Sequence, residues 1–418
     1  MALFPVHEAE IKNGLRIRML PDDTVPLVSF YTFFRVGSRN ERPGTTGISH
    51  LFEHMMFNGA KKYGPKAFDN VLEAHGGSSN AYTTCDMTVY HEEFPVDALE
   101  KVIDLESDRM RSLKISASTL EKEREVVMEE RRMRVDNEIA GLMDEELSSL
   151  VWKAHPYRWP VIGWMGDIQN ITQADCTDFF SRYYAPNNAT LWVTGAIDAA
   201  QTLKWVRRYY SDIPSGKAPV PVLDAEPEQK GERRAKIEHP AHAPSVMIAF
   251  RGPSGHHDDA WTLDVLQFAL AVGESSILTQ RLVHQREVAV HVSLDWGGRI
   301  DPGMIGIFME LSPGTDPARA ESALYEELSE IAAKGLSERT LQKAKNNLKA
   351  HLLYELSTNR GRANALGTYE LLLGSWRKGL GLKEKYQTIT QEQVKAAAQK
   401  YFSPLRRSVV TLVPDGTH

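Results

Sequence analysis

An internal repeat constrains the fold of this chain more than any other feature of its sequence. In both copies an amphipathic helix is expected to run into an aromatic pair and a proline, followed by a β-rich run at 189–194 and 408–413. The recurring residues, 218 positions apart (389 − 171 = 218), are Gln169, Ile171, Thr172, Gln173, Tyr183 and Pro186, then Gln387, Ile389, Thr390, Gln391, Tyr401 and Pro404. We therefore expect an α+β fold of two homologous domains, each an antiparallel-rich sheet packed against helices.

Length and composition agree with two domains. A chain of 418 residues is too long for one compact core, and a polar, proline-containing stretch separates the copies. We expect a domain at 1–214, a linker at 215–231 and a second domain at 232–418. The net charge of −6 gives no reason to invoke nucleic acid.

No apolar run reaches the length of a membrane span, so a soluble protein is expected. The first 14 residues contain His7, Glu8 and Glu10, which argue against a signal peptide in this sequence. A periplasmic protein with its leader removed would look the same as a cytoplasmic one, so the compartment stays open. Only Cys85 and Cys176 occur, and we interpret both as packing residues.

The stretch His50-Leu51-Phe52-Glu53-His54 suggests a metal site. Two imidazoles four residues apart on a helix point the same way, and H-x-x-E-H is the inverted form of a zinc-peptidase signature. Hydroxyls at Thr45 and Thr46 could cap such a helix. The alternative is a hydrogen-bonded histidine pair on an ordinary helix.

A second helix supplies carboxylates. A capping box at Ser118–Glu121 is expected to open it, with Val126, Val127 and Met133 marking its apolar stripe. Glu123 and Glu130 fall on that stripe, whereas Glu125, Glu129, Arg131 and Arg132 should face water. Buried carboxylates need cationic partners, and a divalent metal is one candidate. The alternative is a fully solvated face.

The repeat tests the metal hypothesis. The five polar positions are His50, Glu53, His54, Glu123 and Glu130. Adding 218 to each leads only to apolar residues in the second copy: Phe268, Ala271, Val272, Leu341 and Leu348. An offset of 216, suggested by Phe34-Arg35 and Phe250-Arg251, also leads to apolar residues at the first three. Packing of this fold therefore does not require the polar side chains, which favours a functional role.

With these residues in place, the chain resembles the pitrilysin-type zinc peptidases with an inverted motif, and specifically the half-length branch of the mitochondrial processing peptidase beta subunit and its bacterial relatives. The family segment E-R-[DE]-V-[IV]-x-x-E matches Glu123–Glu130 position for position. Gly76–Thr84, His155–Tyr157 with Val161–Gly163, and Asn188–Gly195 are also family-like. The resemblance implies Zn²⁺ held by His50, His54 and Glu130, with Glu123 in support.

Such a ligand set leaves a fourth metal position for water, as in catalytic sites. Glu53 would then act as general base, and the expected reaction is hydrolysis of peptide bonds. A strand expected from Asn80 to Tyr90 alternates small and larger residues, which is typical of an edge that accepts an extended peptide. The resemblance implies Asn80 and Ala81 as substrate contacts.

One departure from the family concerns an Arg and a Tyr seven residues apart that complete the site. The corresponding positions here are Val283 and Val290, while His284 and His291 lie one residue out of register. We therefore expect the metal-bearing subunit of a heterodimer whose homologous partner lacks H-x-x-E-H and supplies the pair, with a homodimer left open. The rival class is a non-catalytic core or scaffold subunit with the same fold.

Overall fold

The computed structural model describes residues 4–415 as two compact units, each built from three segments of the chain. Unit 1 contains the chain up to Arg132, Trp159–Leu223 and Glu355–Leu371, and unit 2 contains Met133–Arg158, Asp224–Tyr354 and the chain from Leu372. The chain passes between the units at 223–224, within the linker expected at 215–231. Residues 133–158, from the first half of the chain, belong to unit 2, and residues 355–371, from the second half, belong to unit 1. The domain boundaries at 214 and 232 therefore remain a proposal about where the two duplicated halves of the sequence begin and end.

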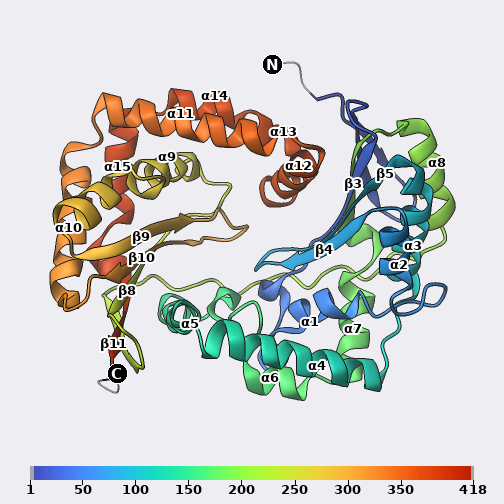
Figure 1. Cartoon of the computed structure of the whole chain (residues 1–418), viewed down its shortest axis with the longest axis horizontal. Helices are drawn as coiled ribbons and strands as arrows, with labels where there is room; N and C mark the ends of the chain where they lie inside the picture. Colours follow the sequence, from blue (N-terminus) through green and yellow to red (C-terminus); the bar gives the residue numbers. More distant parts are fainter. Residues whose placement is uncertain (1–3, 416–418) are drawn as a thin grey trace. The chain divides into compact units, whose positions relative to one another are not determined.

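Unit 1 is built on a six-stranded sheet with the order β1-β2-β6-β3-β5-β4, in which only β2 and β6 run parallel. Its strands are β1 His7–Glu10, β2 Arg16–Pro21, β3 Leu27–Phe34, β4 Ser78–Thr83, β5 Thr88–Pro95 and β6 Ala189–Gly195. Its helices are α1 Ile48–Met55, α2 Ala67–Ala74, α3 Leu99–Ser112, α4 Ala117–Arg131, α6 Met165–Asn170, α7 Gln173–Tyr183, α8 Ala199–Tyr210 and α12 Asn359–Leu373. Strand β4 is the terminal strand, and α1 contacts it (Figure 1).

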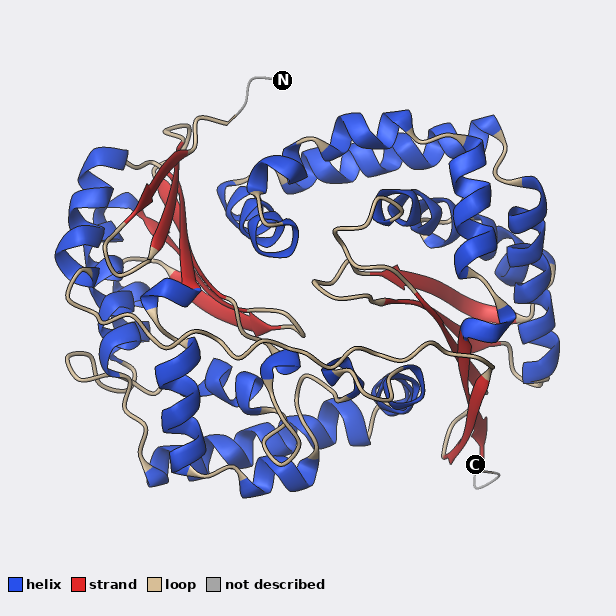
Figure 2. Cartoon of the chain, turned by 180° about the vertical axis from the view of Figure 1, so that it is seen from behind, coloured by secondary structure: helices blue, strands red, loops and turns tan. Residues whose placement is uncertain are grey.

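Unit 2 repeats this plan with the order β7-β11-β8-β10-β9, in which only β7 and β11 run parallel. Its strands are β7 Arg233–His239, β8 Ser245–Arg251, β9 Ala289–Trp296, β10 Met304–Leu311 and β11 Arg407–Pro414. Its helices are α5 Ile139–Val151, α9 Ala260–Ala271, α10 Pro317–Lys334, α11 Glu338–Glu355, α13 Trp376–Leu380, α14 Leu382–Thr388 and α15 Gln391–Tyr401. Figure 2 shows the helices gathered around each sheet.

The two sheets confirm the α+β fold expected from the repeat. Both copies place one parallel pair near the same end of the strand order and end on a strand whose outer edge is unpaired. The recurring motif forms α7 and α15, each opened by a capping box, at Thr172 with Asp175 and at Thr390 with Gln393. Strands β6 and β11 follow, as predicted. Within residues 4–415, no helix is both long and apolar enough to cross a membrane.

Helix α12 comes from the second half of the chain but packs on the sheet of unit 1. Glu370 accepts hydrogen bonds from Arg18 on β2 (2.6 Å) and from Trp192 on β6 (3.1 Å), and these groups are almost fully buried. Gly367 lies directly on the ring of Phe33 in β3, where a Cβ atom would come within 2.1 Å of the ring. A helix from the second half of the chain is therefore part of the core of unit 1.

Gly367→Ala should destabilise unit 1, because the added methyl group has to displace Phe33 from a packed core. We expect a loss of about 1–3 kcal/mol in the free energy of unfolding, which is typical of overpacking. Thermal and denaturant unfolding followed by circular dichroism would measure it. Gly166→Ala in α6 is the matched control, because nothing lies within 4 Å of the Cβ position there. Equal stability of the two variants would contradict the tight contact.

Candidate metal centre

Helix α1 begins at a position fixed by a buried carboxylate. Glu41 accepts hydrogen bonds from the backbone N–H groups of Gly47 and Ser49, both at 2.8 Å, and burial raises the pKa of this carboxyl to about 8. No side-chain hydroxyl caps the helix, so the expected role of Thr45 and Thr46 as caps was wrong. The hydroxyl of Thr46 instead donates to Asp167 at 2.7 Å.

A close contact between two glycines aligns α1 with α4. Gly47 and Gly163 both have left-handed φ angles of 87°, and a Cβ atom on either would lie within 2.5 Å of backbone atoms of the other's segment. The carbonyl of Gly163 accepts a hydrogen bond from Arg131, the last residue of α4, at 2.7 Å. The start of α1 is thereby tied to the end of α4, one residue beyond Glu130.

Three details of α4 differ from the sequence-based expectation. The helix starts at Ala117 with Ser116 as its cap, so the capping box predicted at Ser118–Glu121 was wrong. Val127 is buried, but Val126 and Met133 are 49% and 62% exposed and do not belong to an apolar stripe. Arg131, expected to face water, is buried because Gly163 accepts its hydrogen bond. The prediction that Glu123 and Glu130 point inward was based on that stripe. Both side chains are nevertheless only 17% exposed.

The structure brings His50, His54 and Glu130 together. Oε2 of Glu130 lies 3.6 Å from Nε2 of His50 and 3.2 Å from Nε2 of His54, and one ligand atom of each residue lies within 4.8 Å of the others. Ligand atoms about 2.1 Å from a tetrahedral zinc ion lie about 3.4 Å apart. Two imidazole nitrogens and a carboxylate oxygen at these spacings fit Zn²⁺, and these three protein ligands would leave one position open.

Glu123 lies against the other nitrogen of His54. Its Oε2 is 3.6 Å from Nδ1 of His54, and hydrogen bonding to His54 and Asn58 holds the pKa of Glu123 below its usual value. The pKa of His54 is raised, since the hydrogen bond to Glu123 and the charges of Glu130, Glu53 and Glu123 outweigh the effect of burial. A carboxylate behind a metal-binding imidazole fixes the tautomer that presents the other nitrogen to the metal.

Glu53 faces strand β4. The hydroxyl of Thr83, the last residue of that strand, donates a hydrogen bond of 2.6 Å to Oε2 of Glu53. Nothing in the sequence pattern marked Thr83, Glu41 or Arg131 as residues that support the site. Thr83 lies in a family-like segment and Arg131 directly follows another, but only the folded chain shows what they contact.

The strand predicted from Asn80 to Tyr90 is two strands. β4 ends at Thr83 and β5 starts at Thr88, because the hydroxyl of Thr84 accepts the N–H groups of Asp86 and Met87 and closes a turn. Asn80 pairs with His91 and is exposed on the terminal strand. Its side-chain oxygen accepts the N–H of Ala81 at 2.8 Å.

The two valines at the family's Arg and Tyr positions belong to unit 2. Val283 lies in the π-helical turn Thr279–Gln285, and Val290 lies in β9 with 50% of its surface exposed. The neighbouring His284 is also exposed, with its Nε2 3.4 Å from Oε2 of Glu274. Neither valine offers a side-chain hydrogen-bond donor to a substrate.

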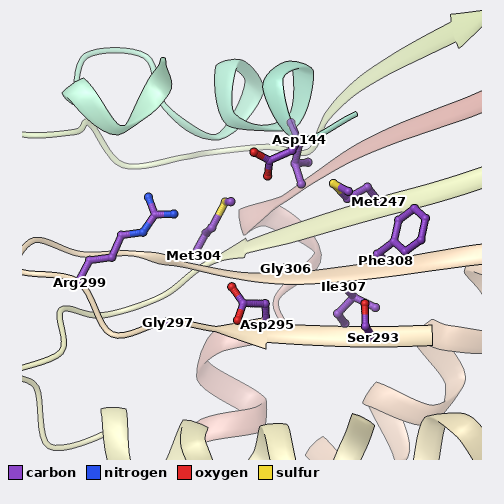
Figure 3. A pocket seen from close by; sticks show the side chains of 11 residues that line it. Asp144, Met247, Ser293, Asp295, Gly297, Arg299, Met304, Gly306, Ile307 and Phe308 are labelled. Atoms are coloured by element: carbon purple, nitrogen blue, oxygen red, sulfur yellow. The ribbon is translucent and has the colours of Figure 1, made fainter. Parts of the chain in front are cut away.

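Unit 2 contains a hollow whose lining residues are not the candidate catalytic and metal residues of unit 1. Asp144 reaches into it from α5, while Met247, Met304 and Phe308 come from β8 and β10, and Asp295 and Arg299 from β9 and the loop behind it (Figure 3). None of the five candidate catalytic and metal residues lines it.

Two like α+β units, with a His-His-Glu group in one of them that could hold a metal ion, match a known family of peptidases. Residues 19–163 match the family model described as "Insulinase (Peptidase family M16)", and residues 170–348 match "Peptidase M16 inactive domain". The zinc protease PqqE of Helicobacter pylori is 31% identical over 98% of this chain and 93% of its own length. The chain belongs to peptidase family M16.

Further relatives agree. The beta subunit of the mitochondrial-processing peptidase of Lentinula edodes is 23% identical over 94% of this chain and 86% of its own length. The crystal structure of a protease from Helicobacter pylori superposes with a TM-score of 0.95 at 27% identity, covering 99% of this chain and all of that one. The family likeness thus extends over nearly the whole chain, as the sequence motifs indicated.

Substitution of a candidate metal ligand should weaken metal binding strongly without unfolding the protein. We expect the wild-type chain to bind one Zn²⁺, and Glu130→Gln to weaken binding by more than the ~100-fold at the upper end for loss of an outer-shell partner. Elemental analysis and competition with a chromogenic chelator would measure this. Glu129→Gln, one residue away and exposed, is the control that should bind as wild type. Equal zinc affinity of the two variants would contradict the ligand assignment.

His91, which pairs with Asn80 of the terminal strand, should make stability depend on pH. Burial, followed by the nearby charge of Arg360, lowers its pKa from 6.5 to about 4. Because the folded state disfavours the charged ring, stability is fully present above pH 6.5 and falls as the pH drops toward 4, by about 3 kcal/mol at most. His91→Phe should flatten the dependence of unfolding free energy on pH over that range, and an unchanged slope would contradict this role.

Proposed function

We propose that this chain is a zinc-dependent endopeptidase that hydrolyses unstructured peptides. The observation that carries the proposal is the convergence of His50, His54 and Glu130, with ligand atoms 3.2 and 3.6 Å apart, beside Glu53 on the same helix as the histidines. The three residues would hold the ion, and Glu123 would orient His54. Zinc, when bound there, supplies Lewis acidity and lowers the pKa of a water molecule toward about 7.

Glu53 is the proton carrier of the proposed reaction. It stands between the two histidines in sequence but is not needed as a ligand, so its carboxylate is available to accept a proton from the attacking water. The same carboxyl group then returns that proton to the nitrogen of the leaving amine. Peptide-bond hydrolysis balances with one water consumed and no other reactant.

Strand β4 is the proposed docking site for substrate. It is one of the two terminal strands of the sheet as described, and a terminal strand offers unpaired backbone groups to an extended peptide. Asn80 is exposed there and its side chain occupies the N–H of Ala81, which an incoming backbone carbonyl could take over. Only a chain segment without its own tertiary structure can add to the edge in this way, so folded proteins are not substrates.

We further propose that the active species is a heterodimer in which this chain bears the metal. Val283 and Val290 stand where the resembling family has an Arg and a Tyr, and a valine side chain can neither donate a hydrogen bond nor carry charge. A homologous partner without H-x-x-E-H would supply the pair. One of the relatives is by its name the beta subunit of a processing peptidase, which supports this arrangement.

The second candidate is a non-catalytic scaffold subunit with the same fold. It is favoured by the missing Arg and Tyr, and by the match of residues 170–348 to a model described as an inactive domain. Zinc content separates the two candidates. A scaffold subunit would purify without stoichiometric zinc, whereas the peptidase would retain it.

Glu53→Gln should separate zinc binding from catalysis. The amide that replaces the carboxylate has the same size but cannot accept a proton, so we expect kcat to fall by about 10³-fold with zinc content unchanged. Cleavage of an internally quenched, unstructured peptide would measure the rate. Glu125→Gln, on the exposed face of α4, should leave the rate as it is. Full activity of the Glu53→Gln variant would contradict its role as base.

The heterodimer proposal predicts low activity of the isolated chain. Purified alone, the zinc-loaded chain should cleave the same peptide much more slowly than after addition of the partner that co-purifies with it from its natural source. The comparison is made at equal zinc content, so that metal loss is not mistaken for partner loss. Full activity without a second polypeptide would refute the heterodimer while leaving the peptidase proposal intact.

A further inference from the structure

We propose that Thr83 is a positioning residue that orients the carboxylate of Glu53, and that helix α12 fixes Thr83 in place through Tyr82 and Asn364. The inference rests on the proposed peptidase function and deepens it. It gives the second half of the chain, which has no metal-binding group in its own copy of the motif, a part in arranging the catalytic base.

The first contact is the hydrogen bond from the Thr83 hydroxyl to Oε2 of Glu53, at 2.6 Å. A carboxylate on a free side chain can rotate about its last bonds. Holding one of its oxygens sets the plane of the group and therefore the direction of the lone pairs on the other oxygen. A general base works only when its lone pair points at the proton that it takes, so this hydrogen bond bears directly on the rate.

Thr83 is itself held in a rigid backbone. Thr83 pairs with Thr88 across the β4–β5 ladder, and the next residue, Thr84, closes the turn between the two strands. The carbonyl of Thr84 accepts the N–H of Ser38 at 3.2 Å. A Cβ atom on Gly37 would come within 2.4 Å of that carbonyl, so the turn is pressed against the 37–38 segment. The Thr83 hydroxyl therefore starts from a fixed point.

The second contact lies on the opposite face of the same strand. Successive side chains of a strand point to opposite faces, so Tyr82 points away from Glu53. Its hydroxyl donates to Oδ1 of Asn364 on α12 at 2.7 Å. Thr83 thus contacts α1 on one face of β4, and Tyr82 contacts α12 on the opposite face.

Helix α12 is a firm anchor for this strand. Beyond Tyr82, it is tied to the sheet by Arg362 with Asp22, by Arg360 with Glu93 and by the buried Glu370 with Arg18. Gly367 lets the helix lie against Phe33 without a gap. Because β4 is a terminal strand that, among residues 4–415, pairs only with β5, no second described strand steadies it. The Tyr82–Asn364 bond supplies that support from outside the sheet.

Thr83→Val, which removes the hydroxyl at nearly constant shape, tests the first contact. We expect kcat to fall about 10- to 100-fold, as for other outer-shell partners, with KM and zinc affinity changed by less than about twofold. Thr83→Ser should restore most of the rate because it restores the donor. Thr388→Val, which removes an exposed hydroxyl bonded to the carbonyl of Lys385 in α14, is the matched control and should leave the rate unchanged. An unchanged kcat in Thr83→Val, or a loss of zinc, would overturn the proposal.

A double-mutant cycle ties the effect to Glu53. In a Glu53→Gln background, Thr83→Val should cause no further loss of rate, because the base that it orients is gone. A further loss of about 10-fold would mean that Thr83 acts elsewhere, and would overturn the assignment.

Tyr82→Phe tests the contact with α12. It deletes one neutral hydrogen bond, and we expect kcat to fall about fivefold with KM and zinc affinity retained. Tyr209→Phe, which removes a part-buried hydroxyl that donates to Glu100, is the control and should have no effect. A rate equal to wild type in Tyr82→Phe would overturn the role of α12.

Crystal structures of the metal-free wild-type and Thr83→Val proteins provide a measurement that does not depend on activity. We expect one orientation of the Glu53 carboxylate in the wild type and a different or multiple orientation in the variant. An identical carboxylate in both would refute the positioning role. If the wild-type chain cleaves no peptide with or without its partner, the proposed function fails, and the crystal structures still decide whether Thr83 orients Glu53.

Discussion

The close approach of Gly47 and Gly163 is the constraint on which the metal centre depends. A ligand set drawn from two helices needs those helices in a fixed relation, and here the first turn of α1 and the last turn of α4 meet at one point. Arg131 joins the junction one residue after Glu130, while Glu41 anchors the N–H groups just before His50. Any side chain at either glycine would push the helices apart, and the imidazoles would no longer face the carboxylate.

The charges at the site are those that would favour a bound cation. Glu123, Glu130 and Glu53 lie near two imidazoles in a partly buried region, where the hydrogen bond to His54 lowers the pKa of Glu123 and the nearby carboxylates raise the pKa of His54. The second copy solves the same packing problem without charge. Leu341 and Leu348, the counterparts of Glu123 and Glu130, are buried in α11. The fold therefore does not need polar side chains at these positions, and the apolar copy avoids the cost of burying them.

Much of this arrangement could be predicted from the sequence. The repeat indicated two like sheets, and the strand orders agree; the spacing of His50, Glu53 and His54 indicated one helix, and α1 carries all three. The errors are local. Val126 and Met133 looked like core residues because periodicity reports which residues share a face, but not whether anything covers that face. The strand predicted from Asn80 to Tyr90 is interrupted by a turn that the hydroxyl of Thr84 closes. A turn of this kind leaves no trace in the pattern of hydrophobic residues.

By itself the sequence determined the duplicated α+β plan, the helix that carries two histidines and the carboxylates that could join them, because periodicity and motif spacing are properties of short segments. Only the tertiary structure decided that α12 packs in unit 1 and α5 in unit 2, that Arg131 is buried, and that Thr83 reaches Glu53. These contacts join residues 30 to 352 positions apart. Their energies depend on which surfaces meet after folding, and no local pattern records that.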